Sequence, residues 1–220
     1  MAPYQPGTAD PWLRRSWSGA RDPERGTAAA AALAEDGLAV EVLALDVTSD
    51  DSVKQVEYTH GRLDVLVNNA GIVGSRVGPL ETGADEKRLC YETNVFGPVR
   101  VTRAFLPLLR RSPNPRVVMV SSGLGSLAVT SEPGRLESTV NVLPYPSSKT
   151  ALNMITTQYA KALPEFRINA VDPGYTATDL NGHSGTQSVE EASDAVVALA
   201  GIGPDGPTGG FFDRNGPVPW

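Results

Sequence analysis

Apolar runs of the kind that form β-strands alternate with helix-like stretches along most of this chain. Two near-continuous runs, Leu63–Asn69 and Arg116–Ser122, are typical of strands buried in a parallel sheet. Further strands are expected at Leu38–Leu45 and Arg167–Val171, and a short apolar segment follows at Gly210–Asp213. Because β and α elements alternate, the pattern predicts βαβ crossovers and an α/β, Rossmann-like fold: an open parallel sheet with helices on both faces.

The intervening stretches have the composition and spacing of helices. They are Ala28–Glu35, a short helix from Ser49 or Asp50 to about His60, Asp85–Leu109, Tyr145–Leu163 and Val189–Ala200. Gly37 is expected to close the first of them. Pro98 and Pro107 are expected to bend or break the long third stretch.

The first eighteen residues do not follow this alternation. They contain Pro3, Pro6 and Pro11 and no β-branched run, so they are expected to supply neither a buried strand nor a helix after it. We therefore predict an atypical N-terminal segment, residues 1–18, and a single domain, residues 19–220. No linker or internal repeat divides that domain.

Composition and charge are those of a globular protein. The 220 residues, 40% of them hydrophobic and 20% charged, suffice for one substantial α/β domain. A net charge of −6 argues against non-specific nucleic-acid binding, which needs a basic patch. No apolar run reaches the roughly 18 residues of a membrane span, and the first twenty residues lack the apolar core of a secretion signal. These features predict a cytoplasmic protein with neither nucleic-acid nor membrane partners.

Cysteine and histidine are too sparse for a disulfide or a metal site. Cys90 is the only cysteine, which excludes an internal disulfide, fits a reducing cytosol and indicates a core position within a helical pattern. His60 and His183 lie far apart without a Cys or His neighbour, so no metal is expected.

The candidate chemistry starts from Tyr145 and Lys149, which Pro-Ser-Ser separates. Four positions apart on a helix, the two side chains lie one turn above each other on one face. An ammonium group and the positive end of a helix both lower the pKa of a phenol, which then donates and recovers a proton more readily. Ser122 ends a strand, where its hydroxyl can hold a substrate oxygen. Alone, the Tyr–Lys spacing also fits an exposed surface pair.

Further motifs in the same chain order remove that ambiguity. They are Asn68-Asn69-Ala70-Gly71, Asn94-Val95-Phe96-Gly97, Ser121-Ser122-Gly123-Leu124-Gly125, Tyr145 with Lys149, and Pro173-Gly174 with Thr178. On an alternating β/α framework, this series resembles the short-chain dehydrogenase/reductase family. The resemblance extends from Gly19 to about Asp213.

The resemblance implies four catalytic residues. Tyr145 would be the general acid/base that protonates the carbonyl oxygen as hydride arrives. Lys149 would lower the pKa of that phenol and hold the nicotinamide ribose. Ser122 would orient the carbonyl group, and Asn94 would anchor a water molecule in the proton relay.

The resemblance also implies a nicotinamide cofactor. Besides Tyr145 and Lys149, the residues expected to contact it are Arg21, Asp46, Val47, Asn69, Ala70, Gly71, Pro173, Gly174 and Thr178. Asp46 would contact the adenine, and Pro173, Gly174 and Thr178 would border the nicotinamide. The segment Gly19-Ala20-Arg21-Asp22 resembles the end of the family's second strand, where an arginine accepts a 2′-phosphate. This favours NADPH over NADH.

The family's opening unit is missing from this sequence. That unit is a strand, a T-G-x-x-x-G-x-G turn and a helix whose N-terminus receives the cofactor pyrophosphate. Here Gly7 stands alone, so the first β–α unit is truncated or replaced. A shifted start or reading frame, a real loss of the unit, and an unrecognised replacement cradle all remain open. Since that strand is central, its loss is expected to expose strand edges on both sides.

The spacing between Ser122 and Tyr145 is a second departure. Twenty-two residues, Gly123–Pro144, separate them, more than is usual in the family. Such an insertion resembles the monomeric carbonyl-reductase branch, in which it covers the face used elsewhere for helix pairing and builds part of the substrate pocket. We therefore expect a monomer or an ill-defined oligomer.

Together these features predict an NADPH-dependent oxidoreductase that reduces a small ketone, aldehyde or quinone to an alcohol. The alternative is a degenerate relative without nicotinamide chemistry. It would act as a binding or regulatory protein, or as a cofactor-independent proton-transfer enzyme using Tyr145 and Ser122. The presence of all four catalytic residues favours the first reading, because a drifting pseudoenzyme would be expected to lose them.

Overall fold

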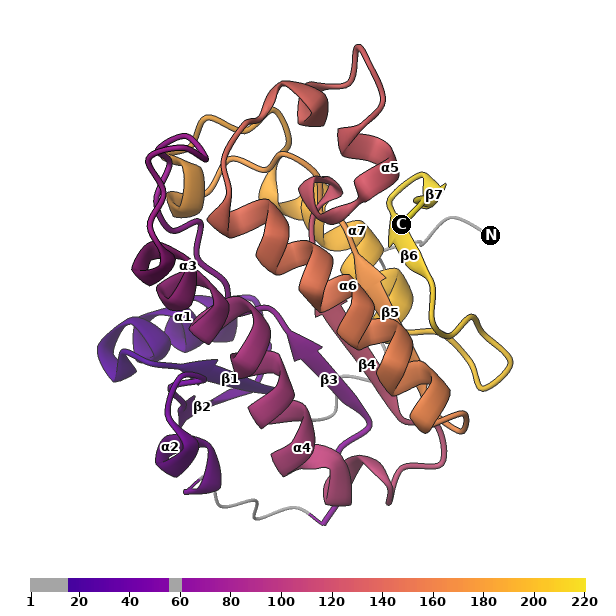
Figure 1. The fold of residues 1–220 in the computed structure, drawn as a ribbon. Coiled ribbons are helices and arrows are strands. Elements are labelled where there is room, and N and C mark those ends of the chain that lie inside the picture. Colours follow the sequence, from indigo (N-terminus) through magenta and orange to yellow (C-terminus); the bar gives the residue numbers. More distant parts are fainter. Residues whose placement is uncertain (1–15, 56–60) are drawn as a thin grey trace. The chain divides into compact units, whose positions relative to one another are not determined.

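The computed structural model describes residues 16–55 and 61–220 and divides the chain into two compact units, residues 1–59 and 60–220 (Figure 1). Each unit has its own parallel strands and packed helices. The α/β, Rossmann-like fold class predicted from the alternating pattern is therefore confirmed. The single domain over residues 19–220 stays a prediction, and each unit is described by itself.

The first unit is a pair of parallel strands with a helix packed on them. Its elements are β1 (Ser16–Ala20), α1 (Pro23–Glu35), β2 (Val40–Ala44) and α2 (Asp50–Lys54). Asp22 caps α1 by accepting the Glu24 N–H at 2.9 Å. Ser49, one of the two predicted first residues of the next helix, caps α2. Gly26 brings α1 onto the strands, because a Cβ there would lie 2.7 Å from a Val42 methyl group.

Strand β1 corrects one boundary taken from the sequence. Residues Ser16–Ser18, assigned above to the atypical segment, pair in register with Val40–Val42 of β2. The pairing uses backbone groups, and β1 is only half-buried, so it needs no continuous apolar run. The other residues of the predicted N-terminal segment lie outside the described part of the chain.

The second unit holds a five-stranded sheet in the order β3-β4-β5-β6-β7. Its strands are β3 (Val65–Asn68), β4 (Arg116–Val120), β5 (Arg167–Val171), β6 (Phe211–Asp213) and β7 (Gly216–Pro217). Strands β3 to β6 are parallel, and β7 adds a short antiparallel partner that the sequence did not predict.

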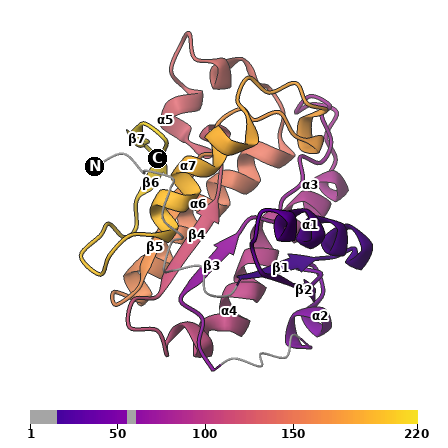
Figure 2. The same ribbon diagram turned by 180° about the vertical axis from the view of Figure 1, so that it is seen from behind.

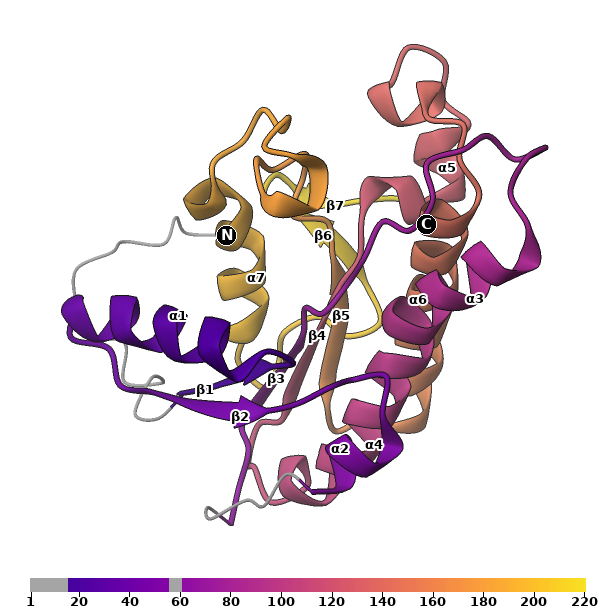
Figure 3. The same cartoon turned by 90° about the vertical axis from the view of Figure 1, so that its left-hand side faces the viewer.

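Helices cover both faces of this second sheet, as the sequence predicts (Figure 2 and Figure 3). The long helices are α3 (Ala84–Tyr91), α4 (Gly97–Leu109), α6 (Pro144–Ala162) and α7 (Val189–Ala200). Helix α7 packs on one face, where Ala195 and Leu199 meet Val118 and Val171 of the central strands. Helices α4 and α6 lie on the opposite face (Figure 3).

Strand β3 is less buried than its apolar run predicts. Val67 is 38% exposed, whereas Val117 and Val118 of β4 are almost fully buried. Among the described residues β3 pairs only with β4, so its other edge has no partner strand. Whether the loss of a central strand exposes this edge stays a prediction.

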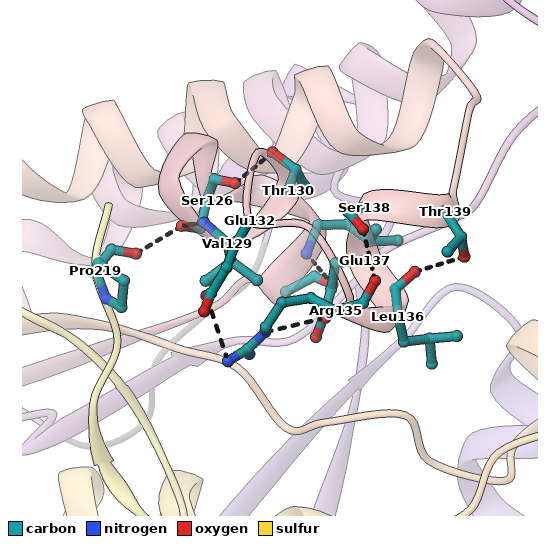
Figure 4. Close-up of polar contacts among 12 residues, drawn as sticks. Ser126, Val129, Thr130, Glu132, Arg135, Leu136, Glu137, Ser138, Thr139 and Pro219 are labelled. Atoms are coloured by element: carbon teal, nitrogen blue, oxygen red, sulfur yellow. Dashed lines mark hydrogen bonds and ion pairs between the residues drawn. The ribbon is translucent and has the colours of Figure 1, made fainter.

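The insertion between Ser122 and Tyr145 folds into short helical turns. They are η2 (Gly123–Gly125), α5 (Leu127–Thr130) and η3 (Leu136–Thr139). Figure 4 shows that Ser126 caps α5 through the Val129 N–H and donates to the Pro219 carbonyl oxygen at 2.7 Å. The Ala128 N–H donates to the Trp220 carbonyl oxygen, so the insertion is held by the last residues of the chain.

A groove between α4 and α6 has no lining residue from the insertion. This groove, of about 370 Å³, is lined by Val99, Met154, Ile155, Gln158, Tyr159 and Ala162. The Met154 side chain in it is 60% exposed. The fixed contacts of the insertion are with the C-terminal residues, and its covering of the family's helix-pairing face stays a prediction.

Two further features of the described residues concern membrane-spanning helices and metal-binding clusters. None of those helices combines the length and the apolarity needed to span a bilayer. Across residues 16–55 and 61–220, no three His, Cys, Asp or Glu side chains come together in a way that could hold a metal ion. His183 is exposed and contacts Asp179, while His60 lies outside the described residues.

Candidate active site

The carboxyl ends of β3, β4 and β5 bring the sequence motifs to one edge of the second sheet. Because the three strands are parallel, the residues that follow them emerge at the same edge. These are Asn69-Ala70-Gly71 after β3, Ser121-Ser122 after β4 and Asp172-Pro173-Gly174 after β5. Helix α6 adds Tyr145 and Lys149 from its first two turns.

Tyr145 and Lys149 lie on one face of α6, as their spacing predicts. The Lys149 ammonium nitrogen is 5.5 Å from the centre of the Tyr145 ring. Its Nζ donates a 2.7 Å hydrogen bond to the Val120 carbonyl oxygen at the end of β4. The Tyr145 hydroxyl is hydrogen-bonded to Ser122, so the tyrosine and the serine already face a common point.

The pKa of Tyr145 moves in the direction opposite to the one expected from the sequence. Burial raises it to about 12; the hydrogen bond to Ser122 lowers it, and the charges of Asp172 and Cys90 raise it further. Lys149 was expected to lower this pKa, but its Nζ is directed to the Val120 carbonyl oxygen. Desolvation of the buried phenolate is therefore the largest effect on this pKa.

Lys149 itself is buried, and burial lowers its pKa to about 8. The Cys90 and Asp172 groups act in the opposite direction and favour the charged form. Near neutral pH the lysine is therefore mostly protonated, while Tyr145 keeps its proton over the whole physiological range. In this state Tyr145 has a proton to donate, and the Lys149 ammonium group next to it is positively charged.

Asn94 is held rigidly behind α6 in a π-helical turn, η1 (Glu92–Phe96), between α3 and α4. The predicted stretch Asp85–Leu109 is thus three helical pieces, with Pro98 in the first turn of the last. The fully buried Asn94 accepts the Ile72 N–H at 2.9 Å and donates to the Ile72 carbonyl oxygen at 2.8 Å and to Ser148 Oγ at 3.0 Å. Such π turns occur frequently at functional sites.

The residues predicted for the nicotinamide side of the cofactor site all belong to the second unit. Gly71 lies next to two of the predicted catalytic residues, since a Cβ there would be 3.5 Å from Lys149 Nζ and 3.6 Å from Asn94 Oδ1. Gly174 has a φ of +79°, which favours glycine, and follows Pro173. Thr178 caps the short helical turn η4 (Asp179–Asn181). The absence of a side chain at residue 71 beside Lys149 is compatible with a ribose near the ammonium group, and the binding of this half of the cofactor stays a prediction.

The residues predicted to contact the adenine side of the cofactor lie in the first unit. Arg21 is exposed between β1 and α1. Asp46 accepts hydrogen bonds from the Thr48 N–H at 2.9 Å and hydroxyl at 2.7 Å, just before α2, with Val47 next to it. Their approach to residues 69–71 of the second unit stays a prediction.

Three residues near the reaction centre were not singled out as functional in the sequence. Asp172 and Glu137 both approach Gly123, where a Cβ would lie 2.9 Å from Asp172 Oδ2 and 3.1 Å from Glu137 Oε1. Cys90, predicted only as a core residue, is fully buried with its thiol 3.6 Å from Ser148 Oγ. The position of Asp172 directly before Pro173-Gly174 is the one sequence signal for it; Glu137 has none, because only folding brings the insertion to Gly123.

Comparison with known proteins shows the family to which the sequence is related. The profile described as short chain dehydrogenase matches residues 16–188. (−)-Isopiperitenone reductase of Mentha piperita is 35% identical over 244 residues, covering 78% of each chain. Salutaridine reductase of Papaver somniferum is 31% identical over 238 residues, covering 77% of this chain and 76% of the relative.

A solved structure gives the same fold. The NADPH-bound carbonyl reductase from chicken fatty liver superposes with a TM-score of 0.80 at 24% identity, covering 93% of this chain and 87% of that one. At this identity the likeness bears on the fold, and it agrees with the α/β architecture described above.

Proposed function

This chain belongs to the short-chain dehydrogenase family of oxidoreductases, and we propose that it reduces a carbonyl compound to an alcohol with NADPH. The observation that supports this most directly is the cluster of Ser122, Tyr145 and Lys149 at the carboxyl edge of the parallel sheet. A hydroxyl pair hydrogen-bonded to each other beside an ammonium group is suited to receive a carbonyl oxygen.

Tyr145 is the proposed proton donor. Its raised pKa keeps the phenol protonated at neutral pH, so a proton is available when negative charge develops on the substrate oxygen. Ser122 is the proposed orienting group, because its hydroxyl is bonded to the Tyr145 hydroxyl and both can reach the same oxygen.

Lys149 is proposed to do two things. Its positive charge next to the phenol stabilises the phenolate left after proton transfer, and its ammonium nitrogen, 3.5 Å from where a Cβ on Gly71 would lie, is the proposed partner of the ribose. Asn94 is proposed to hold the Ile72 backbone next to Gly71, and thereby the position of Gly71 itself. Bound NADPH would supply the hydride that the side chains of this chain cannot supply.

The cofactor choice rests on Arg21, an exposed arginine after β1, where a 2′-phosphate would meet a positive charge. Asp46 and Val47 are the proposed adenine contacts, Asn69, Ala70 and Gly71 the proposed ribose wall, and Pro173, Gly174 and Thr178 the proposed nicotinamide border.

The proposed substrates are ketones, aldehydes or quinones of modest size. The relatives' names, a reductase of isopiperitenone, a reductase of salutaridine and a carbonyl reductase, support this class. Leu127 and Leu136 have exposed apolar side chains and belong to the insertion between Ser122 and Tyr145. We take them to favour a substrate that is largely apolar.

The test is oxidation of NADPH, followed by its absorbance, with a panel of cyclic ketones, aldehydes and quinones, in a chain to which the family's first strand, glycine-rich turn and helix have been added. We expect carbonyl-dependent consumption that is faster with NADPH than with NADH and is strongly reduced by Y145F. Consumption that Y145F leaves unchanged would contradict the proposal. Binding of carbonyl compounds without any turnover, at saturating NADPH, would favour the binding-protein alternative.

A further inference from the structure

Asp172 joins the two turns that border the reaction centre. It follows β5, and its Oδ1 accepts the Gly174 N–H at 3.0 Å. The backbone of Gly123, directly after Ser122, also donates a hydrogen bond to this carboxylate. One side chain therefore connects the serine-bearing turn after β4 with the Pro173-Gly174 turn after β5.

The insertion approaches the same point through Glu137. Asp172 Oδ2 and Glu137 Oε1 both lie within 3.1 Å of the place that a Cβ on Gly123 would occupy. The two oxygens are therefore at most about 6 Å apart, within the range over which like charges affect each other. Glu137 is partly neutralised by Arg135, whose Nε lies 3.5 Å from its other oxygen (Figure 4). The charge of Asp172 acts on both members of the Tyr145–Lys149 pair.

Two groups act electrostatically on the charge of Lys149. Cys90 of α3 and Asp172 both favour the charged form of Lys149. Burial raises the pKa of the Cys90 thiol above its ordinary value, so the thiol is largely uncharged at the pH where Lys149 titrates. Tyr145 of α6, with its pKa raised to about 12, is uncharged there too. Glu137 and Asp213 act on Asp172 itself, whose pKa is raised first by burial and then by these two carboxylates.

We propose that Asp172 is a positioning residue of this active site: it ties the Ser122-bearing turn to the Pro173-Gly174 turn, and from there its negative charge favours the ammonium form of the buried Lys149. The assignment rests on the proposed function, because it gives a role to the Tyr145–Lys149 pair. The connection to Glu137 extends this role to the insertion, which reaches the reaction centre through the same turn at Gly123.

The test measures the charge of Lys149 directly and needs no turnover. Lys149 is one of four lysines in the chain, so its carbon-13 NMR signal at Cε can be assigned with a K149M variant. The pH titration of this signal is compared in the full chain, in D172N and in E137Q. Asparagine keeps one oxygen that accepts a backbone N–H but removes the charge.

We expect D172N to lower the Lys149 pKa by on the order of 1 pH unit, because the charge that favours the ammonium form is gone. E137Q should leave the Lys149 pKa close to that of the parent chain, since Glu137 faces Arg135 and Asp172. A folded D172N whose Lys149 titrates as in the parent chain, or at a higher pH, would overturn the proposal. An equal shift in E137Q would assign the charge to the carboxylate pair, not to Asp172, and would also overturn it.

The same titration separates this inference from the proposed function. If the chain shows no carbonyl reduction but D172N shifts the Lys149 pKa, the positioning role stands and the reaction is different. If reduction is observed and the pKa does not move, the function stands and Asp172 has no role in it. Because D172A removes the acceptor oxygen as well, a larger loss of folding stability in D172A than in D172N measures the link between the two turns.

Discussion

The ammonium nitrogen of Lys149 lies 5.5 Å from the centre of the Tyr145 ring, on the same face of α6. Each group is protonated at neutral pH for a different reason: burial raises the pKa of the phenol, whereas the pKa of the buried lysine falls only to about 8. At neutral pH the pair therefore consists of an uncharged phenol, which can donate a proton, and a positively charged ammonium group.

Replacing Tyr145 by phenylalanine removes only the hydroxyl. In a chain to which a strand, glycine-rich turn and helix of the family have been added, we expect kcat for carbonyl reduction to fall by about 10² to 10⁴, with a smaller change in KM. Y159F is the matched control, since Tyr159 is on the same helix but lines the α4–α6 groove. Near-full activity of Y145F would show that Tyr145 is not the acid and would favour the binding-protein reading.

The buried charge of Lys149 is expected to lower the free energy of unfolding at neutral pH. Its pKa of about 8 in the folded state lies below the ordinary 10.5, so the unfolded chain binds more protons between these values and the free energy of unfolding rises with pH across that window. The cost is fully present below pH 8 and amounts to about 3 kcal/mol at most.

K149M should therefore stabilise the protein at about pH 7 by roughly 1–3 kcal/mol, the lost hydrogen bond to Val120 offsetting part of the gain. The difference from the parent chain should shrink at about pH 10. Urea denaturation at both pH values measures it, with K161M, an exposed lysine on the same helix, as the control. A K149M variant that is less stable at neutral pH would contradict the assigned cost.

Asn94 should matter for stability as well as for the site. In N94A the Ile72 N–H and carbonyl groups lose their buried partners, which should lower the free energy of unfolding by about 2–4 kcal/mol. T93A, one position earlier in the same turn and half-buried, is the control and should cost much less. Denaturant titration compares them, and equal losses in the two variants would argue against the role given to Asn94.

The affinity for NADPH should be low in the chain as its sequence stands. Backbone N–H groups at a helix N-terminus provide much of the grip on a pyrophosphate, and no T-G-x-x-x-G-x-G turn is present in the sequence. Titration followed by nicotinamide fluorescence should give weak binding or none. A sub-micromolar Kd would instead demonstrate a replacement cradle.

The quaternary state is expected to be a monomer or a polydisperse mixture. The unpartnered edge of β3 among the described residues and the open α4–α6 groove both favour association without fixed stoichiometry. Light scattering coupled to size exclusion measures it, and M154E should reduce any association that uses the groove. A uniform tetramer would contradict the expectation.

The sequence by itself determined the order and type of the elements. Apolar periodicity is local, so the strands β2, β4 and β5 and the helices α6 and α7 could be predicted within a few residues. The pairing of Tyr145 with Lys149 was equally predictable, because side chains four apart on a helix lie on one face. The motifs after parallel strands predicted which residues meet at the edge of the sheet.

Only the tertiary structure decided the properties that depend on residues far apart in the chain. Burial by the surrounding elements raises the pKa of Tyr145, whereas local spacing alone suggested that it would fall. The contacts of Asp172 with Gly123, and of the insertion with Pro219, join segments that no short motif connects. Strand β1 forms without an apolar run, since backbone pairing with β2 suffices. Desolvation and long-range pairing depend on the whole folded chain. A sequence pattern can therefore identify the residues involved, but not the resulting pKa values or contacts.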